Sequence, residues 1–286
     1  MNKAALLTTL FTLLLSASTS WAKPLIVTSI RPLTMIVQAI GGKQVDVQQL
    51  LPDTEEPHHY SLRISDKLLL NRADLVIWVG PELESFLVRA ISNLDPEKVI
   101  TAISLADIQS SKATESNDPH IWLNPNNGIV IATEVSNWIA AHFPDLRDNV
   151  FVHQQRFRAE TLATSKTINK RLFAARDMRV LVDHDAFGHF FSAFDIRQVG
   201  ALKTTSGLPA GAGNLQAVLS GAEFDCIVSE PRSAHVRVGT IAAKTAARTV
   251  IIDPLGADVS DAGNGYLSLL QNIATSLQGC LPEALP

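Results

Sequence analysis

Two similar stretches decide the predicted fold: ADLVIWVGPE at residues 73–82 and FDCIVSEPR at residues 224–232. Each contains an apolar run rich in β-branched residues and ends near Glu and Pro, the pattern of a buried strand that runs into a loop. Two longer stretches, PLIVTSIRPLTMIVQAIG at 24–41 and RVLVDHDAFGHFFSAF at 179–194, both have the pattern of strand, short loop and helix. The sequence therefore predicts two related α/β halves.

Apolar runs alternate with helical patterns through both halves. The predicted strands cover residues 25–29, 45–51, 75–79, 180–183, 226–229 and 250–252. Strands that alternate with helices form parallel sheets with helices on their faces. We therefore expect an α/β fold with two lobes, each a parallel sheet flanked by helices.

One long helix is predicted between the halves, over residues 148–176. This stretch has good helix formers and neither Gly nor Pro, and Pro144 stands just upstream. Its apolar residues are sparse, which is typical of a surface helix with a narrow buried face. The expected organisation is an N-terminal lobe over 23–147 and a C-terminal lobe over 177–286, joined by this rigid helix.

The first 22 residues have the pattern of an export signal. Lys3 supplies a basic start, residues 5–15 an apolar run, and Ser20 to Ala22 a cleavage site of the kind that signal peptides carry. The run is shorter than the roughly 20 residues of a membrane-spanning helix, and no Cys lies near the cleavage site to carry a lipid. We expect a signal peptide over 1–22 and a free periplasmic protein that begins near Lys23.

Charge and length narrow the class of protein further. Without Lys3, 23 of the 24 basic residues face 28 acidic ones, and no basic cluster is present. This balance argues against a nucleic-acid partner. Removal of 22 of the 286 residues leaves 264, a length that favours two domains over one and so a cleft between them.

The two cysteines, Cys226 and Cys280, both lie in the last quarter of the mature chain. In an exported protein the favoured interpretation is one disulfide, which would close a loop of roughly 55 residues and contribute about 4 kcal/mol in the chain-entropy model. A thiolate metal site is the alternative, but no CxxC motif or Cys-His cluster surrounds either residue.

Three histidines lie immediately after apolar segments or within loops that follow them, in LLPDTEEPHHYSLR, NDPHIWLNP and VLVDHDAFGHF, namely His58, His120 and His184. Ligands of open α/β sheets bind at the carboxyl ends of the strands, so residues far apart in sequence can meet there. Asp253, in VIIDPLG, follows another predicted strand in the same manner. Three imidazoles and one carboxylate are donors for a tetrahedral zinc site.

The donor types favour Zn²⁺ over the harder cations. Imidazole nitrogens suit this borderline-soft ion, whereas Ca²⁺ and Mg²⁺ prefer oxygen ligands. Mn²⁺ and Fe²⁺ stay open as alternatives, because a bidentate Asp253 raises the coordination number. Histidine ligands usually donate their other N–H to a carboxylate or carbonyl; Glu230 is the favoured partner, ahead of Asp118 and Asp185. His59 is expected to be exposed or to support a ligand without binding the metal, and His189 to pack on the side of a helix.

The whole mature chain resembles the periplasmic zinc-binding proteins of the ZnuA type, in cluster A-I (cluster 9) of the solute-binding proteins of ABC importers. The resemblance runs in order through LLPDxxxxHxYSLRxSD at 50–66, RADLVIWVGPELESF at 72–86, DPHIWLNP at 118–125, HDAFGHF at 184–190, SEP at 229–231 and DPLG at 253–256. It implies His58, His120, His184 and Asp253 as metal ligands. His184 resembles the zinc members, since manganese members usually carry Glu there, and the cysteine pair matches the disulfide of zinc-type proteins.

The chain departs from the family pattern at two places. Zinc-uptake members often carry a long His- and acid-rich loop before the second ligand, but residues 112–117 are short and contain no His. Some members have Glu directly before the first ligand, where this chain has Pro57. The coordination would then be completed by Asp253 or by water.

The function that the resemblance implies is capture of Zn²⁺ between the lobes and its delivery to the ABC permease in the inner membrane. We expect the protein to be a monomer. His58 and His120 would come from the first lobe, and His184 and Asp253 from the second. Three alternative functions stay open: a manganese or iron carrier on the same fold, a zinc hydrolase, and a zinc buffer or adhesin without a transporter. No HExxH or comparable motif supports an enzyme.

Overall fold

The structure of the protein, a computed structural model, describes residues 23–111, 118–211, 213, 216, 223–231, 235–260 and 264–281. The predicted signal peptide at 1–22 and the short segment at 112–117 lie outside the described residues. Within the described ranges, none of the helices combines the length and the apolar character that crossing a bilayer requires.

Two four-stranded sheets form the centre of the protein, and neighbouring strands in both are parallel. The first has the order β2-β1-β3-β4 and the second the order β6-β5-β7-β8, so the two halves share one topology. The predicted α/β fold with two parallel sheets is confirmed. The strands are β1 (Leu25–Thr28), β2 (Asp46–Gln49), β3 (Leu75–Trp78), β4 (Val99–Thr101), β5 (Arg179–His184), β6 (Arg197–Lys203), β7 (Cys226–Ser229) and β8 (Arg248–Ile251).

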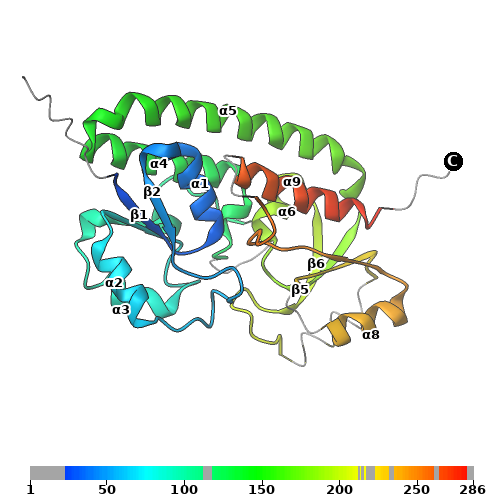
Figure 1. Cartoon of the computed structure of the whole chain (residues 1–286). Coiled ribbons are helices and arrows are strands. Elements are labelled where there is room, and N and C mark those ends of the chain that lie inside the picture. Colours follow the sequence, from blue (N-terminus) through cyan, green and yellow to red (C-terminus); the bar gives the residue numbers. More distant parts are fainter. Residues whose placement is uncertain are drawn as a thin grey trace, which may run out of the picture.

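Helices cover the sheets and connect them (Figure 1). Local signals begin several of them: Pro125 occupies the first turn of α4, and the side chain of Asn124 accepts the N–H of Asn126, which satisfies a backbone donor that the helix leaves unpaired. The helices are α1 (Arg31–Gly41), α2 (Ile64–Arg72), α3 (Val88–Ile91), α4 (Pro125–His142), α5 (Arg147–Arg171), α6 (Gly188–Phe194), α8 (His235–Thr245) and α9 (Gly265–Gln278).

The long helix α5 runs along the top of both halves (Figure 1). A 3-10 turn at Phe173–Ala175 follows its end at Arg171. Its buried residues recur every three or four positions, which makes one narrow face, as expected for a helix that lies on a surface. The domain division at residues 147/148 and 176/177 stays a prediction. The buried residues are Val150, Gln154, Phe157, Thr161, Thr164 and Ile168.

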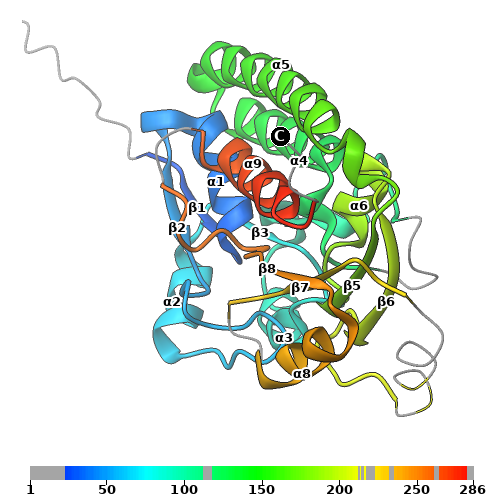
Figure 2. The same ribbon diagram turned by 90° about the vertical axis from the view of Figure 1, so that its right-hand side faces the viewer.

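The C-terminal helix α9 connects the two halves a second time. It packs against α1 of the first half and against α5, and the three helices lie together in Figure 2. One apolar cluster runs from Ile26 in β1 to Leu277 in α9. The disulfide between Cys226 and Cys280, with Cα atoms 5.6 Å apart, ties the end of α9 to the start of β7. The halves are therefore joined by a shared core as well as by α5.

Candidate metal centre

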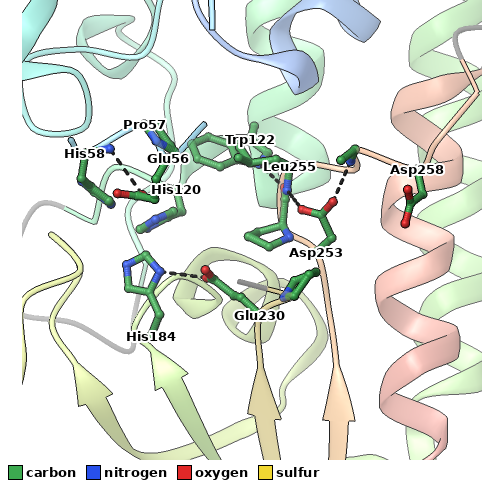
Figure 3. A pocket seen from close by; sticks show the side chains of 13 residues that line it. Glu56, Pro57, His58, His120, Trp122, His184, Glu230, Asp253, Leu255 and Asp258 are labelled. Carbon is green, nitrogen blue, oxygen red and sulfur yellow. Dashed lines mark hydrogen bonds and ion pairs between the residues drawn. The ribbon is translucent and has the colours of Figure 1, made fainter. Parts of the chain in front are cut away.

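The three histidines singled out from the sequence meet at one place. His58 lies in the loop after β2, His120 stands directly before the turn that leads into α4, and His184 is the last residue of β5. A ring nitrogen from each lies within 4.8 Å of the others. The ring centroids are 5.7 Å apart for His58 and His120, 5.5 Å for His58 and His184, and 5.0 Å for His120 and His184. Figure 3 shows the rings turned toward one another.

Hydrogen bonds select the nitrogen that each ring offers. Nδ1 of His120 lies 2.8 Å from Oδ1 of Asp118, and Nδ1 of His184 lies 2.8 Å from Oε1 of Glu230. A carboxylate that accepts from Nδ1 leaves Nε2 for a metal and fixes the ring orientation. Nε2 of His58 is buried and has no hydrogen-bond partner among the described residues. We therefore expect Nε2 of all three rings to face the space that a metal ion would occupy.

Burial and mutual repulsion keep two of the rings neutral. Burial, followed by the proximity of His120 and His184, lowers the pKa of His58 to about 3. The pKa of His120 also lies well below its ordinary value, first because of burial and then because of His184. Both rings are therefore unprotonated at neutral pH, the state in which imidazole binds metal.

His184 behaves differently from the other two. Burial acts to lower its pKa, but the hydrogen bond and the negative charge of Glu230 more than offset this, and the pKa is raised above 6.5. Its Nε2 lies 3.3 Å from the carbonyl oxygen of Thr205, to which a protonated ring donates. His184 is therefore the ring of the three from which a cation must displace a proton first.

Four carboxylates line the same cavity as the rings, and two of them, Asp253 and Glu56, are candidates for a fourth ligand. Asp253 lies there, but Oδ1 accepts the N–H of Leu255 at 2.8 Å and Oδ2 the N–H of Ala257 at 2.6 Å. Within the described residues, the close group of ring nitrogens does not extend to its carboxylate. Glu56 lies beside His58 in Figure 3, where Oε1 accepts the N–H of His58 at 3.3 Å. Burial raises the pKa of Glu56.

Glu56 was missed by the sequence analysis, which considered only the position directly before His58. The signal was present, since an acidic residue two positions before a candidate ligand can return to the same site if the loop turns. The segment does turn: the N–H of His59 donates to the carbonyl of Glu56 at 3.2 Å.

The cavity has the size expected for a small ligand. Its volume is about 210 Å³, below the roughly 300 to 1,000 Å³ of pockets that hold organic ligands. A metal ion with a few waters fits this space, since one water takes about 30 Å³. Besides the rings, the lining comprises Glu56, Pro57, Trp122, Glu230, Pro231, Asp253, Pro254, Leu255, Ala257 and Asp258.

The remaining histidines near the site do not face it. His59 is exposed. His189 in α6 is buried, and its Nε2 donates to the carbonyl oxygen of Asp118 at 3.0 Å. Since Asp118 also accepts the backbone N–H of His120 at 3.0 Å, His189 supports the segment that carries His120.

The chain is similar over most of its length to a protein family and to individual known proteins. The family model described as zinc-uptake complex component A, periplasmic, matches residues 26–280. The high-affinity zinc uptake system protein ZnuA of Haemophilus ducreyi is 29% identical, over 96% of this chain and 99% of the relative. Among solved structures, the periplasmic zinc-binding protein TroA of Treponema pallidum has a TM-score of 0.76 at 21% identity, covering 90% of this chain and 99% of its own. FpvC of Pseudomonas aeruginosa in complex with Mn²⁺ has a TM-score of 0.77 at 20% identity, covering 91% and 98%.

Proposed function

Because this chain belongs to the family of periplasmic zinc-uptake components, we propose that it captures Zn²⁺ at His58, His120 and His184 and delivers the ion to the membrane part of an ABC importer. The family consists of transport components and not of enzymes. The observation that carries the proposal is the convergence of three imidazole nitrogens within 4.8 Å of one another, which matches the donor set of a zinc site.

The proposed ion lies between the two halves. His58 and His120 come from the half that contains the first sheet, and His184 ends a strand of the second sheet. Glu230 holds His184 in the orientation that directs Nε2 to the ion, and Asp118 does the same for His120. Because both halves supply ligands, the binding free energy of the ion depends on the relative position of the halves.

Zinc is proposed over manganese because three of the donors are imidazoles. Manganese is the second candidate, since Glu56 and Asp253 bring carboxylates to the same cavity and FpvC holds Mn²⁺ on the same fold. Competition calorimetry with Zn²⁺, Mn²⁺ and Fe²⁺ tests the choice. We expect zinc to displace both other ions, and an affinity for manganese equal to that for zinc would overturn the assignment.

The chain is a component of a zinc-uptake complex. We further propose that residues 1–22 direct its export, that the mature protein acts as a monomer, and that the permease binds the zinc-loaded form. Mass spectrometry of the protein from the periplasm should give a chain that begins near Lys23. Recovery of the uncleaved chain in the cytoplasm would contradict the export proposal.

The fourth ligand is tested by two conservative substitutions. Asp253 remains the proposed carboxylate, and Glu56 is its competitor because fewer described hydrogen bonds engage its oxygens. Asp253→Asn and Glu56→Gln each keep the size of the side chain and remove the charge. Substitution of the true ligand should lower the zinc affinity by about tenfold or more, if a donor contributes at least as much as the outer partners of metal ligands. Equal affinities in both variants and the parent would mean that water completes the coordination.

The zinc affinity should fall with decreasing pH because of His184. Its pKa is raised above 6.5, so the metal-free site takes up a proton as the pH falls through that raised value. Zinc must then displace this proton, and the affinity should drop about tenfold per pH unit below the pKa. Glu230→Gln removes the charge that raises the pKa, so the drop should begin at a lower pH. Titration calorimetry between pH 5.5 and 8 in several buffers measures both; a variant that keeps the parent's pH profile would exclude this role of Glu230.

A further inference from the structure

The side chain of Arg31, at the start of α1, lies between two loops that reach the metal cavity. It is 13% exposed. Its Nε donates to the carbonyl oxygen of Gly256 at 2.9 Å, and a terminal nitrogen donates to the carbonyl oxygen of Val259. Its other terminal nitrogen pairs with Oδ2 of Asp53 at 2.8 Å. One guanidinium thus binds a loop of the first half and a loop of the second.

The loop of the first half is the one that carries His58. Asp53 precedes His58 between β2 and α2, and its other carboxylate oxygen accepts Nε2 of Gln49 at 2.7 Å. Gln49 is the last residue of β2 and also donates to the carbonyl oxygen of Leu51. The ion pair with Arg31 therefore fixes a loop that is anchored to the first sheet.

The loop of the second half is the one that carries Asp253. The carboxylate of Asp253 accepts the N–H groups of Leu255 and Ala257, so residues 253–257 form one compact turn. Gly256 has φ +70°, a conformation that favours glycine, and a Cβ there would lie 3.1 Å from Cδ1 of Leu269, so the turn packs closely against α9. Arg31 holds this turn through Gly256 and Val259.

A second tie supports the same turn from the first half. Nε1 of Trp122 donates to the carbonyl oxygen of Pro254 at 2.8 Å, and Trp122 follows His120 by two residues. The hydroxyl of Tyr266 donates to the carbonyl oxygen of Trp122 at 2.7 Å. The segments that carry His58 and His120 are thus each tied to the turn that carries Asp253.

We propose that Arg31 is a positioning residue that couples the His58 loop to the Asp253 turn, so that zinc leaves only when this tie between the halves loosens. The proposal rests on the proposed zinc site. It assigns to Arg31 an effect on the rate of zinc release that exceeds its effect on zinc capture, because the tie must break for the halves to separate around the ion.

Stopped-flow transfer of zinc to a chelator tests the proposal in the mature full-length protein. Arg31→Met removes the hydrogen bonds of the guanidinium to Gly256, Val259 and Asp53. We expect zinc to dissociate about tenfold to a hundredfold faster, the factor that corresponds to hydrogen bonds of a charged group, with an unchanged association rate. Arg31→Lys keeps the charge, and its zinc dissociation rate should lie between those of the parent and of Arg31→Met. The matched control is Arg156→Met, because Arg156 forms an exposed ion pair with Glu160 on α5 and should release zinc like the parent.

A measurement without metal separates this proposal from the zinc assignment. In the metal-free protein, the amides of Leu255 and Ala257 should exchange hydrogen faster in Arg31→Met than in the parent or in Arg156→Met. If the parent bound no zinc, the proposed function would fail while the exchange still reported the tie. If Arg31→Met did not fold, Asp53→Asn would replace it, with a release several times faster than that of the parent. Unchanged release together with lower thermal stability would reduce Arg31 to a structural role and overturn the proposal.

Discussion

Replacing His58 by alanine should lower the affinity for zinc by at least about a hundredfold. If four donors share the roughly 10 to 16 kcal/mol of a structural zinc site about equally, one imidazole contributes about 2.5 to 4 kcal/mol, which corresponds to roughly a hundredfold to a thousandfold in affinity. Nε2 of His58 has no partner among the described residues, so its removal takes away a metal donor without stranding a protein group. His120 and His184 are less suitable, since their loss leaves Asp118 or Glu230 without the hydrogen bond that each accepts.

His59→Ala is the matched control for this experiment. It changes the same residue type one position along the same loop, and His59 is exposed. The control should bind zinc with the affinity of the parent, as measured by competition with a fluorescent chelator. Without metal, both variants should have the melting temperature of the metal-free parent. An equal loss of affinity in the two variants would show that the loop and not the His58 ring matters.

Removing the disulfide should lower the free energy of unfolding by about 4 kcal/mol in the chain-entropy model. The bond between Cys226 and Cys280 closes a loop with a sequence separation of 54 and ties β7 to the end of α9. Both cysteines are buried, at 0% and 3% exposure, so alanine is the suitable replacement because it introduces no buried polar group. Urea unfolding of the Cys226→Ala/Cys280→Ala double variant measures the loss.

The reduced parent provides the control for the double variant. Parent protein with reductant should unfold at nearly the urea concentration of the double variant, and adding reductant to the variant should change nothing. The cysteines are not among the cavity residues, so the folded variant should retain its zinc affinity. Loss of zinc binding in the variant would instead support the thiolate alternative.

The sequence predicted the inner strands and two of the four edge strands, β2 and β8, and missed the other two. Runs such as LVIW in β3 and CIVS in β7 are fully buried and stand out as β-branched apolar segments. β4 has three residues, and β6, with the sequence RQVGALK, is mostly half-buried and contains a glycine. Edge strands have one neighbour and face solvent, so they carry a weaker apolar signal.

The convergence of the three histidines could be predicted from the sequence, whereas the identity of the fourth ligand could not. His58 follows β2 and His184 ends β5, and topology brings such positions to one edge of the fold. His120 follows a polar stretch, and the motif DPHIWLNP identified it instead. The roles of Glu56 and Asp253 depend on which backbone N–H groups their oxygens accept, and no residue pattern encodes this. Arg31 bonds to carbonyls 225 and 228 residues away, which only the folded chain brings near.

The organisation of the halves was also only partly visible in the sequence. The helical pattern of α5 predicts a long helix that joins the two halves. The packing of α9 on α1 does not, because the apolar face of a helix specifies that it is buried but not against which half. We expect this second connection to limit separation of the halves, so that a tie such as Arg31 would matter for release.

Anomalous diffraction at the zinc edge, from crystals grown with one equivalent of Zn²⁺ per chain, tests the central claim most directly. The account predicts one dominant peak that lies roughly 2.0 to 2.1 Å from Nε2 of each of His58, His120 and His184. A zinc ion bound elsewhere on the chain, or bound through fewer than these three nitrogens, would contradict it.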